Sequence, residues 1–296
     1  MSSQLCYPYR THCGIRMSTT TDDDLIEQNV SDVCRAMLDD ATGDVLATGF
    51  SASGVEALLG VLAEADDPPS IRLLATEPVL KTVTSDFTVA GTAADLMVAE
   101  ALSLRTTGKR LDGPLLCTEG AVVAVVPTDD QAAGLVARDE TFVEAARSEY
   151  TERWEEADTF RLRTPPLSRV RETLDGEFGA DLRADFERMR TALGTERKNG
   201  DSGLDEVVIS LLAAAKNERL LYDISTWGED VGVASRATFS RKKATLEEGG
   251  LIDTEKVPID VGRPRLRLLL GDERLRETDT DELVSVAGSM LSTAGS

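Results

Sequence analysis

The order of secondary-structure signals in the last third of this 296-residue chain restricts its fold more than any other feature. Two helical periods of apolar residues, LDEVVISLLAAAKNE and LLYDISTWGEDVGV, are followed by the turn GVAS and a third helix, SRATFSRKKATLEE. Gly249-Gly250 ends that helix, because glycine is common just past a helix terminus. Two strand patterns follow, LIDTEKVPI and RLRLLL, joined by the tight turn DVGRP. This order predicts a winged helix-turn-helix domain over residues 204–271.

The first half of the chain alternates strand and helix patterns. The apolar runs DVLATGF and IRLLAT are typical of buried strands, and PLLCTEGAVVAVVP of a hairpin turned at Glu119-Gly120. Helices are predicted for DDDLIEQNVSDVCRAML, SASGVEALLGVLAEAD, AADLMVAEALSL and ETFVEAARSEYTERWEEA, the second with Ser51 or Ser53 as its N-cap. The predicted fold class is therefore an α/β domain over residues 21–160 and a C-terminal winged helix-turn-helix of the α+β type.

Three further segments flank these domains. Pro165-Pro166 break regular structure, and the helical and polar stretches that follow predict a helical connector and linker over residues 161–203. Residues 272–296 are expected to form a C-terminal tail that is partly helical. Residues 1–20 are expected to be a disordered or misassigned N-terminal extension, because MSSQLCYPYRTHCGIR lacks the apolar core of a signal peptide and Met17 is an equally good start.

The composition excludes several classes of protein. An apolar fraction of 41% supports packed cores and argues against a wholly disordered chain. No apolar run of the sequence reaches the roughly 18 residues that span a membrane. The four cysteines are too few and too scattered for a disulfide framework. We therefore expect a cytoplasmic protein without a membrane partner.

Acidic side chains dominate the charge: 53 Asp and Glu against 32 Lys and Arg give a net charge of −21. Among the bases, 25 are Arg and only 7 are Lys. Many carboxylates with little lysine are typical of a halophilic protein, because concentrated salt screens their mutual repulsion. An ordinary acidic cytosolic protein is the alternative, and on either interpretation the overall charge does not identify a partner.

One segment reverses this charge. Residues 234–270 hold eight basic and five acidic side chains, a net charge of +3, whereas the rest of the chain holds 24 and 48, a net charge of −24. A charge run is usually only a solvated face. Here the basic side chains fall on the third helix and the strand pair, the two elements of a winged helix that approach DNA. The pattern predicts double-stranded DNA, at a promoter or operator, as the partner.

The period of the third helix separates its core residues from its exposed ones. Phe239 and Leu246 are expected to face the core, and Ser235 to cap the helix. Lys243 follows Phe239 by four residues, so its stem is expected to pack while its ammonium reaches solvent. Arg pairs with guanine, and Ser or Thr with base edges or phosphate. The predicted DNA-binding residues are Ser235, Arg236, Thr238, Ser240, Arg241, Lys242, Lys243, Lys256, Arg263 and Arg265.

A second candidate site lies in the N-terminal domain. The segment VLATGFSASG passes from a strand through a glycine-bearing loop to a helix start, where backbone N–H groups can bind an anion. A small phosphorylated metabolite is the expected ligand, and the basic segment RTTGKR either helps to hold it or ends a helix. A plain turn is the alternative, because the segment matches no dinucleotide or P-loop motif. The candidate contacts are Thr48, Gly49, Ser51, Ser53 and Gly54.

Catalysis and metal binding are not expected. The only histidine is His12, which removes mechanisms that depend on histidine, and the motifs HExxH, GxSxG and CxxC are absent from the sequence. Cys6, His12 and Cys13 are three possible zinc ligands, but no fourth lies near them in the sequence. We expect no metal, no cofactor and no enzyme activity.

Two stretches carry a resemblance to a known family. LLYDISTWGEDVGVASRATFSRKKATLEEGGLIDTEKVPIDVGRPRLRLLL and TPPLSRVRETLDGEFGADLRADFERM closely resemble the haloarchaeal transcriptional regulators called TbsP, and the likeness extends from about Thr21. The N-terminal half, with GAVVAVVP and FVEAARSEYTERWEEA, is more loosely similar to TrmB-type effector domains, which look like phospholipase-D domains. The catalytic HxK of phospholipase D is absent from the sequence, so only its fold is implied.

The resemblance implies a homodimeric DNA-binding regulator of sugar and central carbon metabolism, including gluconeogenesis, that responds to a metabolite. We expect repression, and activation stays open at the level of sequence. A winged-helix adaptor that binds proteins and no operator is the alternative function. Positive charge on both the third helix and the wing favours the DNA-binding regulator, because an adaptor does not need it.

Overall fold

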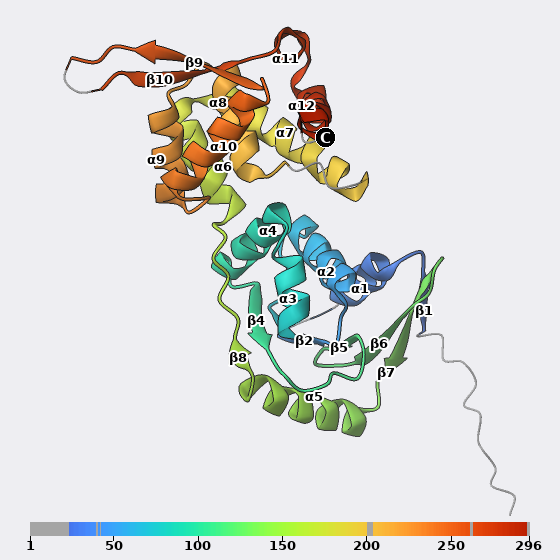
Figure 1. Cartoon of the computed structure of the whole chain (residues 1–296). Coiled ribbons are helices and arrows are strands. Elements are labelled where there is room, and N and C mark those ends of the chain that lie inside the picture. The colour runs from blue at the N-terminus through green and yellow to red at the C-terminus, as the bar shows by residue number, and fades with distance from the viewer. Residues whose placement is uncertain (1–23, 40, 42, 200–203, 261–262, 295–296) are drawn as a thin grey trace, which may run out of the picture.

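The structure is a computed structural model of the chain. It contains a sheet domain in the first half and a mostly helical domain in the second (Figure 1). The expected extension over residues 1–20, with Cys6, His12 and Cys13, lies outside the described residues. The described residues are 24–39, 41, 43–199, 204–260 and 263–294.

The sheet domain is built on a mixed sheet whose strands lie in the order β1-β7-β6-β5-β2-β3-β4-β8. β2, β3 and β4 run parallel, and the other neighbours pair antiparallel. Helices connect the parallel strands, as the alternating pattern predicts. The strands are β1 (Leu25–Glu27), β2 (Val45–Thr48), β3 (Ile71–Ala75), β4 (Leu102–Thr106), β5 (Leu115–Cys117), β6 (Val122–Pro127), β7 (Ala132–Ala137) and β8 (Asp158–Thr159).

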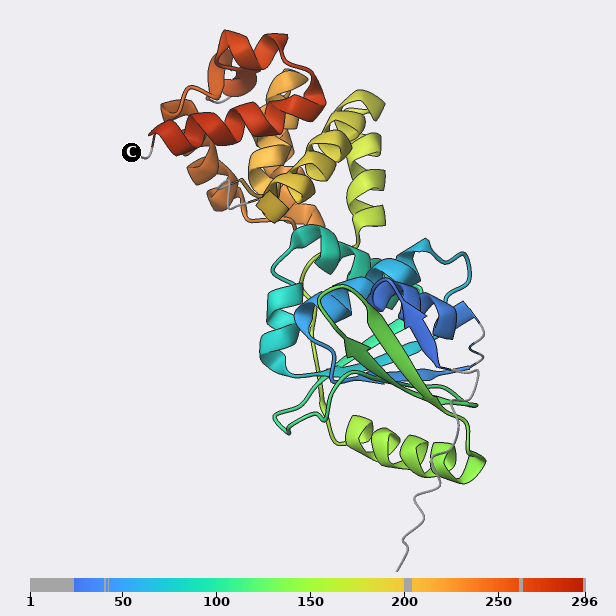
Figure 2. The ribbon, with the colours of Figure 1, turned by 90° about the vertical axis from the view of Figure 1, so that its right-hand side faces the viewer.

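Helices cover both faces of this sheet, α1 to α4 on one side and α5 on the other (Figure 2). Side chains along a strand alternate between the two faces. On β2, Val45 and Ala47 join the core beneath α1 to α4, whereas Leu46 joins the core beneath α5 with Val143 and Trp154. The helices are α1 (Val30–Asp39), α2 (Ala52–Glu64), α3 (Glu77–Val83), α4 (Phe87–Val98) and α5 (Glu140–Glu155).

Several elements of the sheet domain differ from the prediction. Leu25–Glu27 leaves the predicted first helix and pairs with β7, a strand whose sequence AAGLVA is too poor in β-branched residues to signal a strand. The segment ALSL, predicted as helix, contributes to β4, because Glu100 takes a left-handed conformation (φ 59°) just after α4. Helix α3 is not predicted at all.

Two local predictions in the sheet domain are confirmed. Ser51 caps α2, and its Oγ accepts a hydrogen bond from the backbone N–H of Gly54 at 3.2 Å. The hairpin of β5 and β6 pairs Leu116 with Val123 on either side of the predicted turn.

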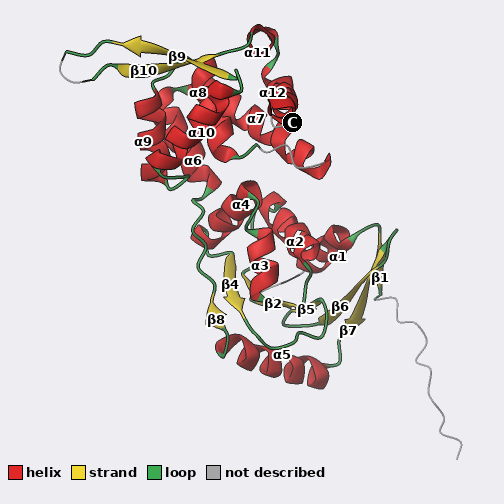
Figure 3. Cartoon of the chain, viewed as in Figure 1, coloured by secondary structure: helices red, strands yellow, loops and turns green. Residues whose placement is uncertain are grey.

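The second domain contains a helix-turn-helix followed by a two-stranded antiparallel sheet, so the predicted winged helix is confirmed (Figure 3). β10 also forms an isolated bridge to Leu220, just before α9. The elements are α6 (Leu167–Phe178), α7 (Ala180–Asn199), α8 (Glu206–Lys216), α9 (Leu221–Val231), α10 (Arg236–Glu248), β9 (Ile252–Val257), β10 (Arg265–Leu270), α11 (Glu273–Glu277) and α12 (Thr280–Ala294).

One core joins all of these helices. Trp227 of α9 is fully buried, packs edge-on against Phe178 of α6 at 6.3 Å between ring centroids, and donates a hydrogen bond from Nε1 to Thr173 Oγ1 at 2.9 Å. Phe186 of α7 and Val284 of α12 belong to the same core. Helices α6 and α7, expected as a connector, and α12, expected as a tail, therefore pack as part of the winged-helix domain.

Helix α4 joins the two domains. Its Asp95 carboxylate accepts hydrogen bonds from the backbone N–H and the hydroxyl of Ser168, at 3.2 and 2.6 Å, at the start of α6. Phe87 lies in the core of the second domain. A Cβ atom on Gly91 would lie 2.6 Å from Leu167 Cγ, so only glycine permits this approach. None of the described helices is long and apolar enough to cross a membrane.

An exposed apolar corner lies at the β1 edge of the sheet. Ile26 of β1 and Val126 of β6 both pair with Ala133 of β7, and Leu135 follows on the same face. Ile26, Val126 and Leu135 are 71%, 43% and 51% exposed, because α5 packs over β2 and β5 and leaves this corner uncovered. We refer to Ile26, Val126 and Leu135 as the apolar corner.

Candidate nucleic-acid interface

A close crossing of α9 and α10 fixes the helix-turn-helix. Gly228 of α9 lies against the ring of Phe239, where a Cβ atom would approach Phe239 Cε2 to 2.3 Å. The Gly228 carbonyl accepts from the backbone N–H groups of Gly232, Val233 and Ala234 at 3.2, 2.8 and 3.2 Å. Gly232 takes a left-handed conformation (φ 96°), which glycine adopts without strain. The turn therefore sets the direction of α10.

The start of α10 is held as the sequence predicts. Ser235 Oγ accepts a hydrogen bond from the backbone N–H of Thr238 at 3.2 Å. Arg241 donates to Thr238 Oγ1 at 3.3 Å, so these polar side chains follow one exposed side of the helix. Phe239 and Leu246 are buried, as their spacing predicts. The core face of α10 is thereby occupied, and its other face is left to solvent.

Three basic side chains of α10 form ion pairs within the domain. Arg236 Nε lies 2.7 Å from Glu229 of α9, and Lys242 Nζ lies 2.7 Å from Asp205 at the start of α8. Lys243 Nζ lies 2.6 Å from Glu247, and its side chain is only 12% exposed, which confirms that its stem packs. Lys242 and Lys243 thus serve contacts within the domain in this structure.

Glu247 ties α10 to the wing. Its carboxylate accepts hydrogen bonds from Lys243 Nζ at 2.6 Å and from Thr254 Oγ1 of β9 at 2.8 Å. These two donors lower the pKa of Glu247 below its ordinary value, because they stabilise the ionised form. The carboxylate is therefore charged at neutral pH and links the helix to the strand pair.

The wing presents its own basic side chains. Lys256 and Arg263 are exposed, Lys256 on β9 opposite Leu266 and Arg263 just before β10. Arg265 is more constrained. Its guanidinium carbon lies 4.0 Å from the centroid of the Tyr222 ring, and its NH1 lies 3.2 Å from Asp223.

A groove of about 490 Å³ runs between α9, α10 and the wing. It brings together four of the ten predicted DNA-binding residues, whereas the other six are outside its described lining: Ser235, Thr238, Arg241, Lys242, Lys243 and Lys256. Sequence reasoning missed Tyr222, although an exposed aromatic side chain at a helix start is a usable signal in a chain with only 4% aromatics. The lining residues are Leu221, Tyr222, Ser225, Arg236, Ser240, Ile259, Arg263, Pro264, Arg265 and Leu266.

The candidate metabolite residues do not all come together. Ser51, Ser53 and Gly54 line a hollow of about 280 Å³ at the start of α2, and none of its described lining residues is charged. Thr48 is buried on β2. Gly49 (φ 74°) is required for packing, because a Cβ atom there would lie 1.8 Å from the Gly113 carbonyl oxygen.

A more basic hollow of about 330 Å³ lies between the loop after β4 and the end of α5. It contains part of the RTTGKR segment, with Lys109 and Arg110, and also Arg153. Lys109 pairs with Glu156 at 2.6 Å, and Arg153 with Asp112 at 3.3 Å.

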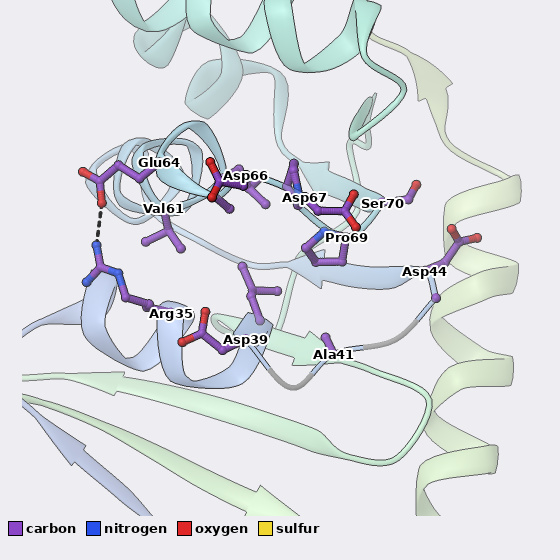
Figure 4. Close-up of a pocket in the computed structure, with 15 residues that line it drawn as sticks. Arg35, Asp39, Ala41, Asp44, Val61, Glu64, Asp66, Asp67, Pro69 and Ser70 are labelled. Atoms are coloured by element: carbon purple, nitrogen blue, oxygen red, sulfur yellow. Dashed lines mark hydrogen bonds and ion pairs between the residues drawn. The ribbon is translucent and has the colours of Figure 1, made fainter.

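A hollow of about 740 Å³ lies between the ends of α1 and α2 and is lined by more carboxylates than bases (Figure 4). Asp39, Asp44, Asp66 and Asp67 line it, and Arg35 is paired there with Glu64 at 2.7 Å. An excess of negative charge does not suit a phosphorylated ligand or DNA. Among the described residues, no group of three or more His, Cys, Asp or Glu side chains is placed to hold a metal ion.

A helix-turn-helix with a basic wing and an arginine-lined groove defines a DNA-binding regulator of the winged-helix class. The sequence matches two descriptions of one family: "Transcriptional regulator TbsP-like, N-terminal" over residues 22–165 and "Transcriptional regulator TbsP-like, C-terminal HTH domain" over residues 166–288. The chain belongs to this family of TbsP-like transcriptional regulators, which confirms the resemblance found in the sequence. A comparison with curated proteins gave no match.

Several solved structures show distant likenesses. TrmBL2, an archaeal chromatin protein with a novel mode of DNA binding, is 17% identical over 49% of this chain and 57% of that one, with a TM-score of 0.34. Nuc of Salmonella typhimurium, a phospholipase D family member, is 13% identical over 47% of this chain and 97% of that one, with a TM-score of 0.35. NucT of Helicobacter pylori is 10% identical over 46% of this chain and 98% of that one, with a TM-score of 0.34. These low scores carry no argument about function.

Proposed function

We propose that this protein binds operator DNA with α10 in the major groove and the wing along the backbone. The observation that carries the proposal is the groove with Arg236, Arg263 and Arg265 in its lining, on a chain whose net charge is −21. Membership of a family of transcriptional regulators with a C-terminal helix-turn-helix supports it. Arginine side chains contact both phosphates and guanine edges.

The proposal divides the predicted contacts by their geometry. Arg241, Thr238 and Ser240 follow the exposed side of α10 and are proposed to read base edges, together with Arg236 once it leaves Glu229. Lys256 and Arg263, exposed on the wing, are proposed to contact phosphates. Ser235 caps the helix, and the first turn of α10 is proposed to lie against the DNA.

A binding experiment tests this function. Genome-wide mapping of bound sites supplies an operator, and gel shifts at high KCl then compare the full chain with Arg241→Ala. A lost bidentate base contact costs about 1–3 kcal/mol, so we expect roughly 10- to 100-fold weaker binding. Arg169→Ala, an exposed arginine of α6, is the matched control and is expected to bind like the unaltered chain. Equal binding by Arg241→Ala would reject the role of α10, and absence of any bound DNA would favour the protein-interaction adaptor.

We further propose that the protein represses genes of sugar and central carbon metabolism, including gluconeogenesis, in a halophilic archaeon, and that it has no enzyme activity. The family resemblance supports the target genes, and the excess of acidic side chains supports the halophilic source. Deletion of the gene is expected to raise transcripts beside the bound sites. A fall in those transcripts would show activation instead.

The metabolite response is proposed to start in the sheet domain. A phosphorylated ligand needs positive charge, so the hollow with Lys109 and Arg110 suits it better than the uncharged hollow at Ser51 and Ser53. Thermal shifts of the full chain against a panel of sugar phosphates detect binding, because a ligand of the folded state raises its stability. Loss of the shift in Arg110→Ala supports the basic hollow, and loss in Ser53→Ala supports the start of α2.

We propose that the regulator acts as a homodimer, since two copies reading two half-sites gain both affinity and operator length. The apolar corner is the proposed contact, because two chains of charge −21 repel each other where carboxylates face and Ile26, Val126 and Leu135 carry no charge. An isologous contact across a two-fold axis places the same corner on both copies. Leu135→Asp is expected to yield a monomer in light scattering, and an unchanged dimer would place the interface elsewhere.

A further inference from the structure

The groove beside the wing contains an arginine that is held in advance of any ligand. Arg265 of β10 lies over the ring of Tyr222, at 4.0 Å from guanidinium carbon to ring centroid, and its NH1 lies 3.2 Å from Asp223. Both partners lie in the first turn of α9, 42 or more residues earlier in the chain. We propose that Tyr222 and Asp223 are positioning residues that hold Arg265 for one phosphate of bound DNA. This inference rests on the proposed DNA-binding function.

Within the described part of the chain, the held guanidinium retains donors that no carboxylate engages. An arginine carries five N–H groups in one plane, and the contact with Asp223 engages one nitrogen. The Tyr222 ring contacts the guanidinium through its carbon, at 4.0 Å from the ring centroid, and adds no second carboxylate. The side chain of Arg265 is 37% exposed, so its remaining donors can reach a phosphate that enters the groove.

The surroundings of Arg265 suit a sugar–phosphate unit of DNA. Arg236 and Arg263 line the same groove and add positive charge near a phosphate. Ser240 supplies a hydroxyl, and Ile259, which is 39% exposed, supplies an apolar surface against which a deoxyribose can pack. A volume of about 490 Å³ accommodates more than a bare phosphate.

The contact with the Tyr222 ring is expected to reduce the rotamer freedom that Arg265 loses when it binds a phosphate. A free arginine side chain loses rotamer freedom when it binds, and this loss weakens the complex. The Tyr222 ring and the Asp223 carboxylate restrict Arg265 before DNA arrives, so less freedom is lost on binding. Removal of the ring is therefore expected to weaken the phosphate contact without removing a charge.

The salt dependence of binding measures this contact directly. Each phosphate contact contributes about 0.9 to the slope of log affinity against log salt concentration. The probe is a duplex of mixed sequence with the full chain, because phosphate contacts do not depend on an operator. Arg265→Ala is expected to lower the slope by about 0.9. Tyr222→Ala is expected to lower the slope in the same direction, and Tyr222→Phe to restore it, since Phe keeps the ring.

The sheet domain offers a matched control. Arg153 lies 5.0 Å from the centroid of the Tyr150 ring, a similar pair far from the groove, so Tyr150→Ala is expected to leave the slope unchanged. A double variant Tyr222→Ala/Arg265→Ala is expected to match Arg265→Ala alone, because the tyrosine acts only through the arginine. If Tyr222→Ala does not fold by circular dichroism, Tyr222→Leu replaces it and keeps the apolar bulk.

The outcomes separate this inference from the proposed function. Arg265→Ala with an unchanged slope overturns the phosphate site. A lowered slope in Arg265→Ala with unchanged slopes in Tyr222→Ala and Tyr222→Leu overturns the positioning role. Either result leaves DNA binding by α10 intact as long as Arg241→Ala weakens operator binding. If Arg241→Ala also binds normally, the proposed interface itself fails.

Discussion

The two domains use the same pair of side chains in different ways. In the sheet domain, Arg153 lies over Tyr150 and contacts two carboxylates, those of Asp112 and Glu149. In the winged-helix domain, Arg265 lies over Tyr222 and contacts only the carboxylate of Asp223 among the described residues. An arginine that is hydrogen-bonded to two carboxylates has a structural role. An arginine that is hydrogen-bonded to a single carboxylate retains donors for a ligand.

Charge alone therefore does not mark the interface. Burial works against the charge of Arg153, but its hydrogen bonds with Asp112 and Glu149 outweigh burial and raise its pKa. The same logic separates residues within α10: Lys243 is engaged by Glu247, whereas Arg241 bonds only to a neutral hydroxyl among the described residues. A basic side chain is a candidate for contact with DNA where the fold leaves some of its N–H donors without a carboxylate partner.

The largest expected effect is at the crossing of α9 and α10. Gly228→Ala forces a Cβ atom into the Phe239 ring, which costs about 3 kcal/mol of stability and turns α10 away from its position. DNA binding is expected to be lost with it. Gly60→Ala in α2 is the matched control, because no described residue lies within 4 Å of its Cβ position, and it is expected to stabilise by up to about 1 kcal/mol. Urea unfolding measures the free energy of unfolding of both variants. Equal values would contradict the close approach of Gly228 to the Phe239 ring.

A carboxylate placed in the groove tests the difference between arginines that retain donors for a ligand and arginines that carboxylates already engage. Ser240→Asp brings an acid beside Arg236 and the expected phosphate, so we expect roughly 10-fold weaker DNA binding at low salt and a smaller loss at high salt, where the charge is screened. Ser240→Ala is expected to bind within a few-fold of the unaltered chain. Gel shifts over a KCl series provide the measurement, and a loss that does not change with salt would argue against an electrostatic cause.

Acid is expected to affect the winged-helix domain before the sheet domain. Burial opposes ionisation of Asp185 in α7, but hydrogen bonds from Asn217 and Thr280 outweigh burial and lower its pKa. Burial likewise opposes ionisation of Glu187, but the hydrogen bond from Arg190 and a second arginine lower its pKa. A lowered folded-state pKa stabilises the fold above the unfolded value of about 4, and that stability is lost as pH falls through the folded value.

Two tryptophans report on this difference, since Trp154 lies in the sheet domain and Trp227 in the winged-helix domain. A Trp154→Phe variant leaves Trp227 as the fluorescent probe, and a Trp227→Phe variant leaves Trp154. The Trp227 signal is expected to change at the higher pH of the two. The reverse order would show that carboxylates of the sheet domain control acid unfolding.

The smallest effect is expected at Lys243. Because its ammonium is paired with Glu247 and its stem packs, Lys243→Met is expected to change DNA affinity by less than about three-fold. Fluorescence anisotropy with a labelled duplex measures this. A loss as large as that of Arg241→Ala would show that Lys243 leaves Glu247 to contact DNA.

Local signals in the sequence predict the winged helix well. The cap at Ser235, the core spacing of Phe239 and Leu246, and the stop at Gly249-Gly250 each depend on a few neighbouring residues. Elements defined by distant partners are not predicted. Leu25–Glu27 becomes a strand only because β7 pairs with it.

The same limit applies to the site. Basic residues of the third helix and the wing are visible as a run of charge, but several of the side chains that engage them lie elsewhere in the sequence. Asp205 pairs with Lys242 from the start of α8, and Tyr222 stacks on Arg265 from 43 residues away. The sequence therefore predicts which elements meet DNA, and tertiary contacts decide which of their side chains remain available.

Hydrogen exchange of the full chain, with and without duplex DNA, locates the surface that contacts DNA. DNA is expected to slow exchange in α10, in the start of α9 around Tyr222 and in the wing formed by β9 and β10, with little change in β2, β3 and α5. Slowed exchange confined to the sheet domain, or no change in α10 and the wing while DNA is bound, would contradict the account.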